Sequence, residues 1–173
     1  MQENIEYAPI GIINTPFKSL VKIPIQASIA KDAVGFITVF DEFVSGLKDL
    51  AGFSHIILLY HFHLSNDYAL SVTPSHDNAN RGVFATRSPK RPNKIGLTVV
   101  QLIGIKKNIL SVRSIDIIDG TPLLDIKPYI ESIDSIQTSG QGWLNEQLKS
   151  TKRPPHLYQS RKKTRSSRVT KRD

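Results

Sequence analysis

The chain has 173 residues and no cysteine, which excludes disulfides, thiolate zinc sites and cysteine nucleophiles and favours a reducing, cytoplasmic compartment. No apolar run approaches the ~18 residues that a membrane span requires, so a soluble protein is expected. The net charge of +8 lies at one end of the chain, because residues 149–173 hold 10 Lys and Arg against 1 acidic residue whereas residues 1–148 hold 13 against 14.

The predicted elements are mainly strands. Apolar runs rich in β-branched and aromatic residues, bounded by Pro, Gly and Asp, predict strands over residues 7–14, 34–40, 54–64, 82–86, 96–105, 109–118 and 121–126. One helix is predicted after Asp41, which can cap it, and before Gly52, which can end it. Its apolar residues Phe43, Leu47 and Leu50 recur at i, i+4 and i+7. Many strands at short spacing favour a barrel or a sandwich, so a mainly β fold with a short helix is expected.

The predicted strand 54–64 carries two histidines on one face. Its period of two places His61 and His63 on the same side. Together with His76 or Asp77 they could hold a metal ion, as in a metal-dependent hydrolase. Because His-x-His is common by chance, histidines that line a pocket or form hydrogen bonds are the favoured interpretation.

A cationic loop follows the predicted strand 82–86. Pro89 and Pro92 stiffen this loop, because each proline fixes its own φ and pushes the preceding residue toward extended geometry. The cations held in this way are Arg87, Lys90, Arg91 and Lys94. A preset cationic array suits a carboxylate or phosphate ligand, and the alternative is a rigid surface connection.

A turn is predicted at Asp119-Gly120-Thr121-Pro122, within a stretch that has three carboxylates and a lysine. This is ordinary turn chemistry. A tight turn also exposes main-chain N–H and C=O groups, which can bind the edge of an adenine ring.

The segment 149–173 is nearly devoid of large apolar residues and rich in Arg, Lys, Ser, Thr and Pro. It cannot bury enough surface to offset the entropy of ordering, so it is predicted to be disordered or to fold only on RNA. Charge runs of this kind bind phosphates without sequence preference, and the alternative is a solubilising tail. The expected organisation is a β-barrel domain over residues 1–136 and a basic extension over residues 137–173.

Three motifs together resemble the TrmO family: Gly52–His55, Gly82–Leu97 and Asp119–Tyr129. The second contains Ala-Thr-Arg-Ser-Pro-Lys-Arg-Pro-Asn-Lys-Ile-Gly-Leu, and the similarity spans roughly Pro9 to Ser135. The resemblance implies a dimeric β-barrel methyltransferase that uses S-adenosylmethionine to methylate N6 of threonylcarbamoyl-adenosine at position 37, in the anticodon loop of tRNA. No Gly-x-Gly-x-x-Gly follows a predicted strand, which disfavours a Rossmann-type methyltransferase and agrees with the resemblance.

The resemblance also implies a set of cofactor contacts and no metal. The contacts fall on Pro24, Ile25, Gln26, His63, Leu64, Arg87, Leu97, Asp119, Gly120, Thr121 and Pro122. Arg87 can pair with the methionine carboxylate, Leu97 can pack on the adenine, and the turn can supply main-chain groups. Members of the family often have Arg in place of Ile25, so a possible contact to cofactor or RNA is missing, and Pro in place of Lys94, so the loop is looser but more charged. Longer members carry a further C-terminal domain where this chain has its basic segment, so the grip on tRNA is expected to differ.

The catalytic base is left open by the sequence. A sulfonium methyl donor is already activated, so such an enzyme mainly aligns the reacting atoms. A base that removes the N6 proton could be His63 or Asp125. The alternatives are a non-catalytic RNA-binding β-barrel and, less favoured, the metal-dependent hydrolase.

Overall fold

The computed structural model describes residues 4–19, 32–74 and 77–145. By internal contacts the chain divides into Met1–Gln137 and Thr138–Asp173. The predicted roles, a methyltransferase barrel and a basic extension, stay predictions, and the segment 149–173 lies outside the described residues. None of the described helices is long and apolar enough to cross a membrane.

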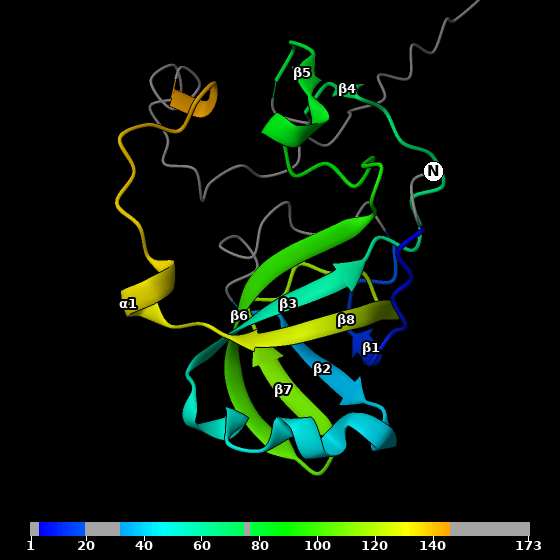
Figure 1. The fold of residues 1–173 in the computed structure, drawn as a ribbon, viewed down its shortest axis with the longest axis vertical. Helices are drawn as coiled ribbons and strands as arrows, with labels where there is room; N and C mark the ends of the chain where they lie inside the picture. Colours follow the sequence, from blue (N-terminus) through cyan, green and yellow to red (C-terminus); the bar gives the residue numbers. More distant parts are fainter. Residues whose placement is uncertain (1–3, 20–31, 75–76, 146–173) are drawn as a thin grey trace, which may run out of the picture. The chain divides into compact units, whose positions relative to one another are not determined.

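Six strands form a closed antiparallel barrel in the order β1-β2-β7-β6-β3-β8 (Figure 1). They are β1 (Gly11–Asn14), β2 (Val34–Val39), β3 (His55–His61), β6 (Ile95–Lys106), β7 (Ile109–Arg113) and β8 (Thr121–Pro128). Closure pairs β1 with β8 and leaves no exposed sheet edge in the barrel. The predicted mainly β barrel is confirmed.

The barrel interior is filled by alternate side chains of its strands. Ile56, Leu58 and Tyr60 of β3 point inward, as the period of two requires, and the intervening residues are more exposed. Each of the other five barrel strands contributes buried side chains to the same core, among them Ile13, Ile37, Val100, Leu110, Val112 and Leu123. The interior is therefore a packed apolar core, and a ligand has to bind at an end or on the outside of the barrel.

Two short strands form a separate sheet after β3. β4 (Ser71–Val72) pairs with β5 (Arg81–Gly82), and the 3-10 turn η4 (Val83–Ala85) follows directly. The predicted strand over 82–86 is therefore wrong beyond its first residue. The Thr86 hydroxyl and main-chain N–H both donate to the Val83 carbonyl, at 2.9 and 3.1 Å, and this closes a turn where a strand would need a partner.

A helical segment is present where one was predicted, but it consists of two 3-10 pieces, η2 (Asp41–Leu47) and η3 (Leu50–Gly52). Asp41 does not cap it, and Asp49 interrupts it with a left-handed φ of 65°. None of its residues is fully buried, and Leu47 and Leu50 are only partly buried against the barrel core, which is too little packing to stabilise a continuous α-helix. The single turn α1 (Glu131–Asp134) was not predicted.

Gly96 makes room for the ring of Tyr60. The two residues are paired between β6 and β3, and a Cβ at position 96 would lie 2.3 Å from a ring carbon. The ring of Phe62 packs edge-on against Tyr60, with centroids 5.3 Å apart. A side chain at position 96 would therefore push the Tyr60 ring out of a filled core.

We expect Gly96→Ala to lower the free energy of unfolding by about 1–3 kcal/mol, because the added methyl overpacks the core. Urea denaturation measures the change. Gly104→Ala is the matched control, because it lies on the same strand and its added Cβ would meet nothing within 4 Å. Equal stability of the two variants would contradict the packing that the structure shows.

Candidate functional site

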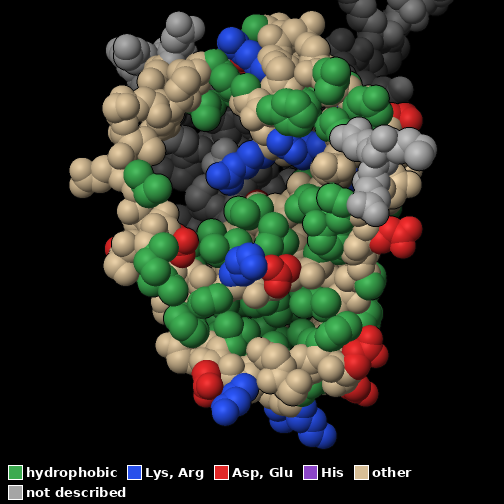
Figure 2. Space-filling view, in the orientation of Figure 1, with side chains coloured by type: hydrophobic (Ala, Val, Ile, Leu, Met, Phe, Trp, Pro, Cys, Tyr) green, Lys and Arg blue, Asp and Glu red, His purple; other side chains and the backbone are tan. Residues whose placement is uncertain are grey.

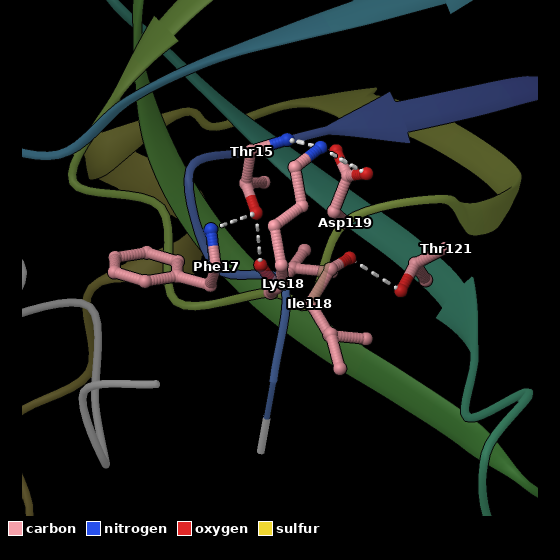
Figure 3. A network of polar contacts seen from close by, with 7 residues as sticks. Thr15, Phe17, Lys18, Ile118, Asp119 and Thr121 are labelled. Carbon is pink, nitrogen blue, oxygen red and sulfur yellow. Dashed lines mark hydrogen bonds and ion pairs between the residues drawn. The ribbon is translucent and has the colours of Figure 1, made fainter. Parts of the chain in front are cut away.

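The turn that joins Ile118 to Thr121 lies beside the chain that follows β1 (Figure 3). The main-chain N–H of Asp119 donates to the Phe17 carbonyl and that of Gly120 donates to the Ile13 carbonyl, each at 2.9 Å. Gly120 has a φ of +75°, which a residue with a side chain rarely adopts. Both N–H groups are therefore used within the protein, and hold the turn against the chain around β1.

The carboxylate of Asp119 fastens this turn to the end of β1 (Figure 3). One oxygen accepts from the Thr15 main-chain N–H at 2.9 Å, and the other accepts from Lys18 Nζ at 2.5 Å. The hydrogen bond from Lys18, followed by that from Thr15, holds the pKa of Asp119 below its usual range. The Thr15 hydroxyl adds a bond to the Ile117 carbonyl at 2.8 Å. In this structure the Asp119 side chain is therefore occupied in holding the turn.

Thr121 and His63 meet at the same end of the barrel, 58 residues apart in the sequence. The buried Thr121 hydroxyl donates to the Ile118 carbonyl at 2.8 Å, and its oxygen lies 3.4 Å from His63 Nδ1. Because the single hydroxyl hydrogen is already donated, the contact is made with Nδ1 as the donor. In neutral imidazole this leaves Nε2 as the proton acceptor.

The four cations of the predicted array have different surroundings. Arg91 Nη1 donates to the carbonyls of Thr86 and Val83 at 2.8 and 3.2 Å. Lys94 Nζ donates to the carbonyl of Asn66 at 2.8 Å. These two side chains hold the loop together, whereas the side chains of the other two cations, Arg87 and Lys90, are exposed.

Tyr60 is the residue of β3 on which the charge of Arg87 acts, and it lies three residues before His63. Burial is the main cause that raises the pKa of the Tyr60 hydroxyl, the charge of Asp116 raises it further, and the charge of Arg87 lowers it. Arg87 is therefore close enough to act electrostatically on Tyr60. Tyr60 is the second-last residue of β3. The sequence offered no signal for Tyr60, because its pattern is that of any inward-facing strand residue.

The remaining predicted contacts lie on the outside of the barrel or outside the described residues. Leu97 is 50% exposed on the outer face of β6, where it pairs with Leu59 of β3, and Leu64 is exposed after β3. Pro122 follows Thr121 at the start of β8. The predicted contacts Pro24, Ile25 and Gln26 lie outside the described residues.

The two candidate bases do not lie together. Asp125 pairs with Lys127 Nζ at 2.7 Å and lines a cavity of about 500 Å³ beneath η2 and η3, at the opposite end of β8 from Thr121. A second pocket of about 310 Å³ lies beside Lys18 and Asp119. His63 is therefore the candidate base that shares an end of the barrel with the predicted ligand contacts.

The hydrolase alternative gains no support from the described ranges. Within residues 4–19, 32–74 and 77–145, no group of three His, Asp or Glu side chains is placed to hold a metal ion. His76, its third histidine, lies outside them.

Known proteins match most of this chain. The profile of the tRNA-methyltransferase O N-terminal domain matches residues 12–135. A probable S-adenosyl-L-methionine-binding protein of Pyrococcus abyssi is 54% identical over 142 residues, 82% of this chain and 77% of that protein. The tRNA (adenine(37)-N6)-methyltransferase of Escherichia coli is 34% identical over 143 residues, 77% of this chain and 61% of that protein. The crystal structure of TrmO from Pseudomonas aeruginosa is similar with a TM-score of 0.68 and 35% identity, over 82% of this chain and 63% of that one.

The closed barrel, with a fastened turn, a histidine and an exposed arginine toward one end, defines a small β-barrel protein with a site for a polar ligand outside its core. The match over residues 12–135 identifies the kind of barrel. The chain belongs to the tRNA-methyltransferase O family, as its sequence motifs predict. It spans less than two thirds of the length of the Escherichia coli and Pseudomonas aeruginosa proteins.

Proposed function

We propose that this chain is a cytoplasmic tRNA methyltransferase that uses S-adenosylmethionine to methylate N6 of adenosine 37, with threonylcarbamoyl-adenosine as its acceptor. The observation that carries the proposal is the meeting of His63 and Thr121 at the end of a tRNA-methyltransferase O barrel. The names of the relatives support the methyl donor and the tRNA substrate. These names do not mention the threonylcarbamoyl group, so this group on the acceptor is the more specific part of the proposal.

The described residues have the chemistry that S-adenosylmethionine requires. Its carboxylate matches the exposed Arg87 guanidinium, which can form a bidentate pair. Its adenine matches the exposed Leu97 side chain, and its hydroxyls match main-chain carbonyls of the turn. We assign the Asp119 side chain to holding the turn, so that its contribution to the site is through the main chain.

His63 is the base in this proposal. When bound, S-adenosylmethionine supplies a methyl group already activated by the sulfonium. As N6 took the methyl group, the S–CH3 bond would break and leave a neutral thioether, and His63 Nε2 would accept the proton that N6 loses. The Thr121 oxygen keeps Nδ1 as the donor, so Nε2 is available for this step. Arg87 and Leu97 orient the donor, and alignment of nitrogen, carbon and sulfur lowers the barrier.

Methyl transfer to defined tRNA tests the function. The purified chain is incubated with labelled S-adenosylmethionine and tRNA that carries threonylcarbamoyl-adenosine, and the nucleosides are identified by mass spectrometry. Label on N6 of the modified nucleoside, and none on tRNA lacking the threonylcarbamoyl group, is the expected result. Binding of RNA without S-adenosylmethionine binding would overturn the proposal in favour of the non-catalytic barrel.

We also propose that the working unit is a homodimer. Besides Leu97, which is assigned to the methyl donor, the outer face of β6 exposes Ile95, Val99 and Ile103. Figure 2 shows hydrophobic side chains across the visible side of the barrel, around one basic side chain next to an acidic one. Large exposed apolar patches mark interaction sites, and a self-complementary contact between two copies would cover this one.

We expect Val99→Glu to convert the dimer into a monomer, because it places a charge in an interface that commonly buries at least ~1,200 Å². Light scattering reports the mass. Ile109→Glu is the control, since Ile109 is similarly exposed but lies on β7. A wild-type chain that is monomeric at working concentration and fully active would rule the dimer out.

A further inference from the structure

Positive charge is concentrated in one part of the described structure. We name residues 64–74 and 77–94, which follow β3 and include β4, β5 and η4, the cationic lobe. It holds 5 Lys and Arg against 2 Asp, whereas the other described residues hold 6 Lys and Arg against 10 Asp and Glu. Within the lobe, Arg81 forms an ion pair with Asp77 at 2.8 Å. Among the described residues this lobe is therefore the part that attracts a polyanion.

The cationic lobe also exposes large aromatic side chains. Phe84 is 75% exposed and Tyr68 is 63% exposed. Figure 2 shows hydrophobic side chains beside Lys and Arg around η4 and the loop that follows it. Cations interleaved with exposed aromatic rings are the surface on which unpaired nucleobases stack.

Phe84 is held on a rigid support. The guanidinium of Arg91 lies 5.9 Å from the centre of the Phe84 ring, and its two hydrogen bonds to main-chain carbonyls fix it there. The Val83 N–H donates to the Leu70 carbonyl at 2.9 Å, so the turn that carries Phe84 is tied to the neighbouring chain. A ring fixed before binding loses little entropy when a base stacks on it.

We propose that Phe84 is a stacking platform for an unpaired base of the tRNA anticodon loop, and that Lys90 pairs with a phosphate beside it. The inference rests on the proposed function for the identity of the RNA. Phe84 and Lys90 are separate from the residues assigned to the methyl donor. Phe84 therefore contributes to substrate affinity, and His63 to the reaction.

Binding of an anticodon stem-loop, followed by fluorescence anisotropy, tests the platform. Phe84→Leu is expected to weaken binding about five- to a hundred-fold, whereas Phe84→Tyr keeps the ring and the affinity. Because stacking is uncharged, Phe84→Leu leaves the slope of log affinity against log salt unchanged. Lys90→Gln lowers that slope by about 0.7. Phe43→Leu, on η2 at the other end of β3, is the control and binds as wild type.

The outcomes separate this inference from the proposed function. Wild-type affinity of Phe84→Leu overturns the platform, whether or not the chain methylates tRNA. A wild-type chain that binds the stem-loop but transfers no methyl group overturns the function, while a weakened Phe84→Leu variant still supports the platform. If Phe84→Leu loses affinity for S-adenosylmethionine by calorimetry, the ring belongs to the donor site and the platform is likewise overturned.

Discussion

Replacing Arg87 with alanine is expected to weaken S-adenosylmethionine binding by about 1.5–3 kcal/mol, or roughly ten- to a hundred-fold. Arg87 is exposed and its charge acts on Tyr60 of β3, whereas the Arg91 guanidinium is held by two main-chain carbonyls. The bound carboxylate would remain without its charge-assisted partner. Because Arg87 is exposed in this structure, its removal should leave the fold unchanged.

Calorimetry measures the Arg87→Ala effect, with thermal unfolding to show that the variant is folded. Lys90→Ala is the matched control, because it removes an exposed positive charge three residues away without removing the planar fork that binds a carboxylate. An equal loss of S-adenosylmethionine affinity in both variants would mean that the site responds to the positive charge of the loop and not to the Arg87 guanidinium itself. Unchanged affinity in folded Arg87→Ala would contradict the assignment.

The barrel strands could be predicted because each buries one face, so that inward residues such as Ile56, Leu58 and Tyr60 alternate with outward ones in the sequence. The helical segment was predicted in the right place but with the wrong geometry. Phe43, Leu47 and Leu50 fit helical spacing, yet Leu47 and Leu50 are only partly buried against the core and Phe43 is 38% exposed. Spacing alone does not distinguish a buried stripe from partly exposed residues.

The sequence indicates which residues belong to the candidate site, but it does not show which of them contact one another. The turn at Asp119 is visible in the sequence, but its ion pair with Lys18 joins residues 101 positions apart and depends on barrel closure. Likewise, Arg87 and Arg91 look equivalent in a cationic loop. Only the folded loop turns the Arg91 guanidinium back onto its own carbonyls and so distinguishes a structural arginine from one available to a ligand.

Removing residues 149–173 is expected to weaken tRNA binding and to flatten its salt dependence. This segment carries 10 Lys and Arg against 1 acidic residue, and the rest of the chain carries 13 against 14. Each phosphate that the segment neutralises contributes ~0.7–0.9 to the slope of log affinity against log salt, so losing about four such contacts would lower the slope by about 3. S-adenosylmethionine binding should be unchanged, because every proposed contact lies between Pro24 and Pro122.

A variant of full length with every Lys and Arg after Leu148 replaced by Gln is the control, because it removes the charge and keeps the chain. If the truncation weakens tRNA binding because charge is lost, this variant should bind like the truncated chain. If the truncation acts through the loss of chain length, this variant should bind like wild type. Combining the truncation with Phe84→Leu should give additive losses, since one removes salt-dependent contacts and the other removes uncharged stacking. A truncated chain with wild-type affinity and slope would leave the cationic lobe as the part of the protein that holds the RNA.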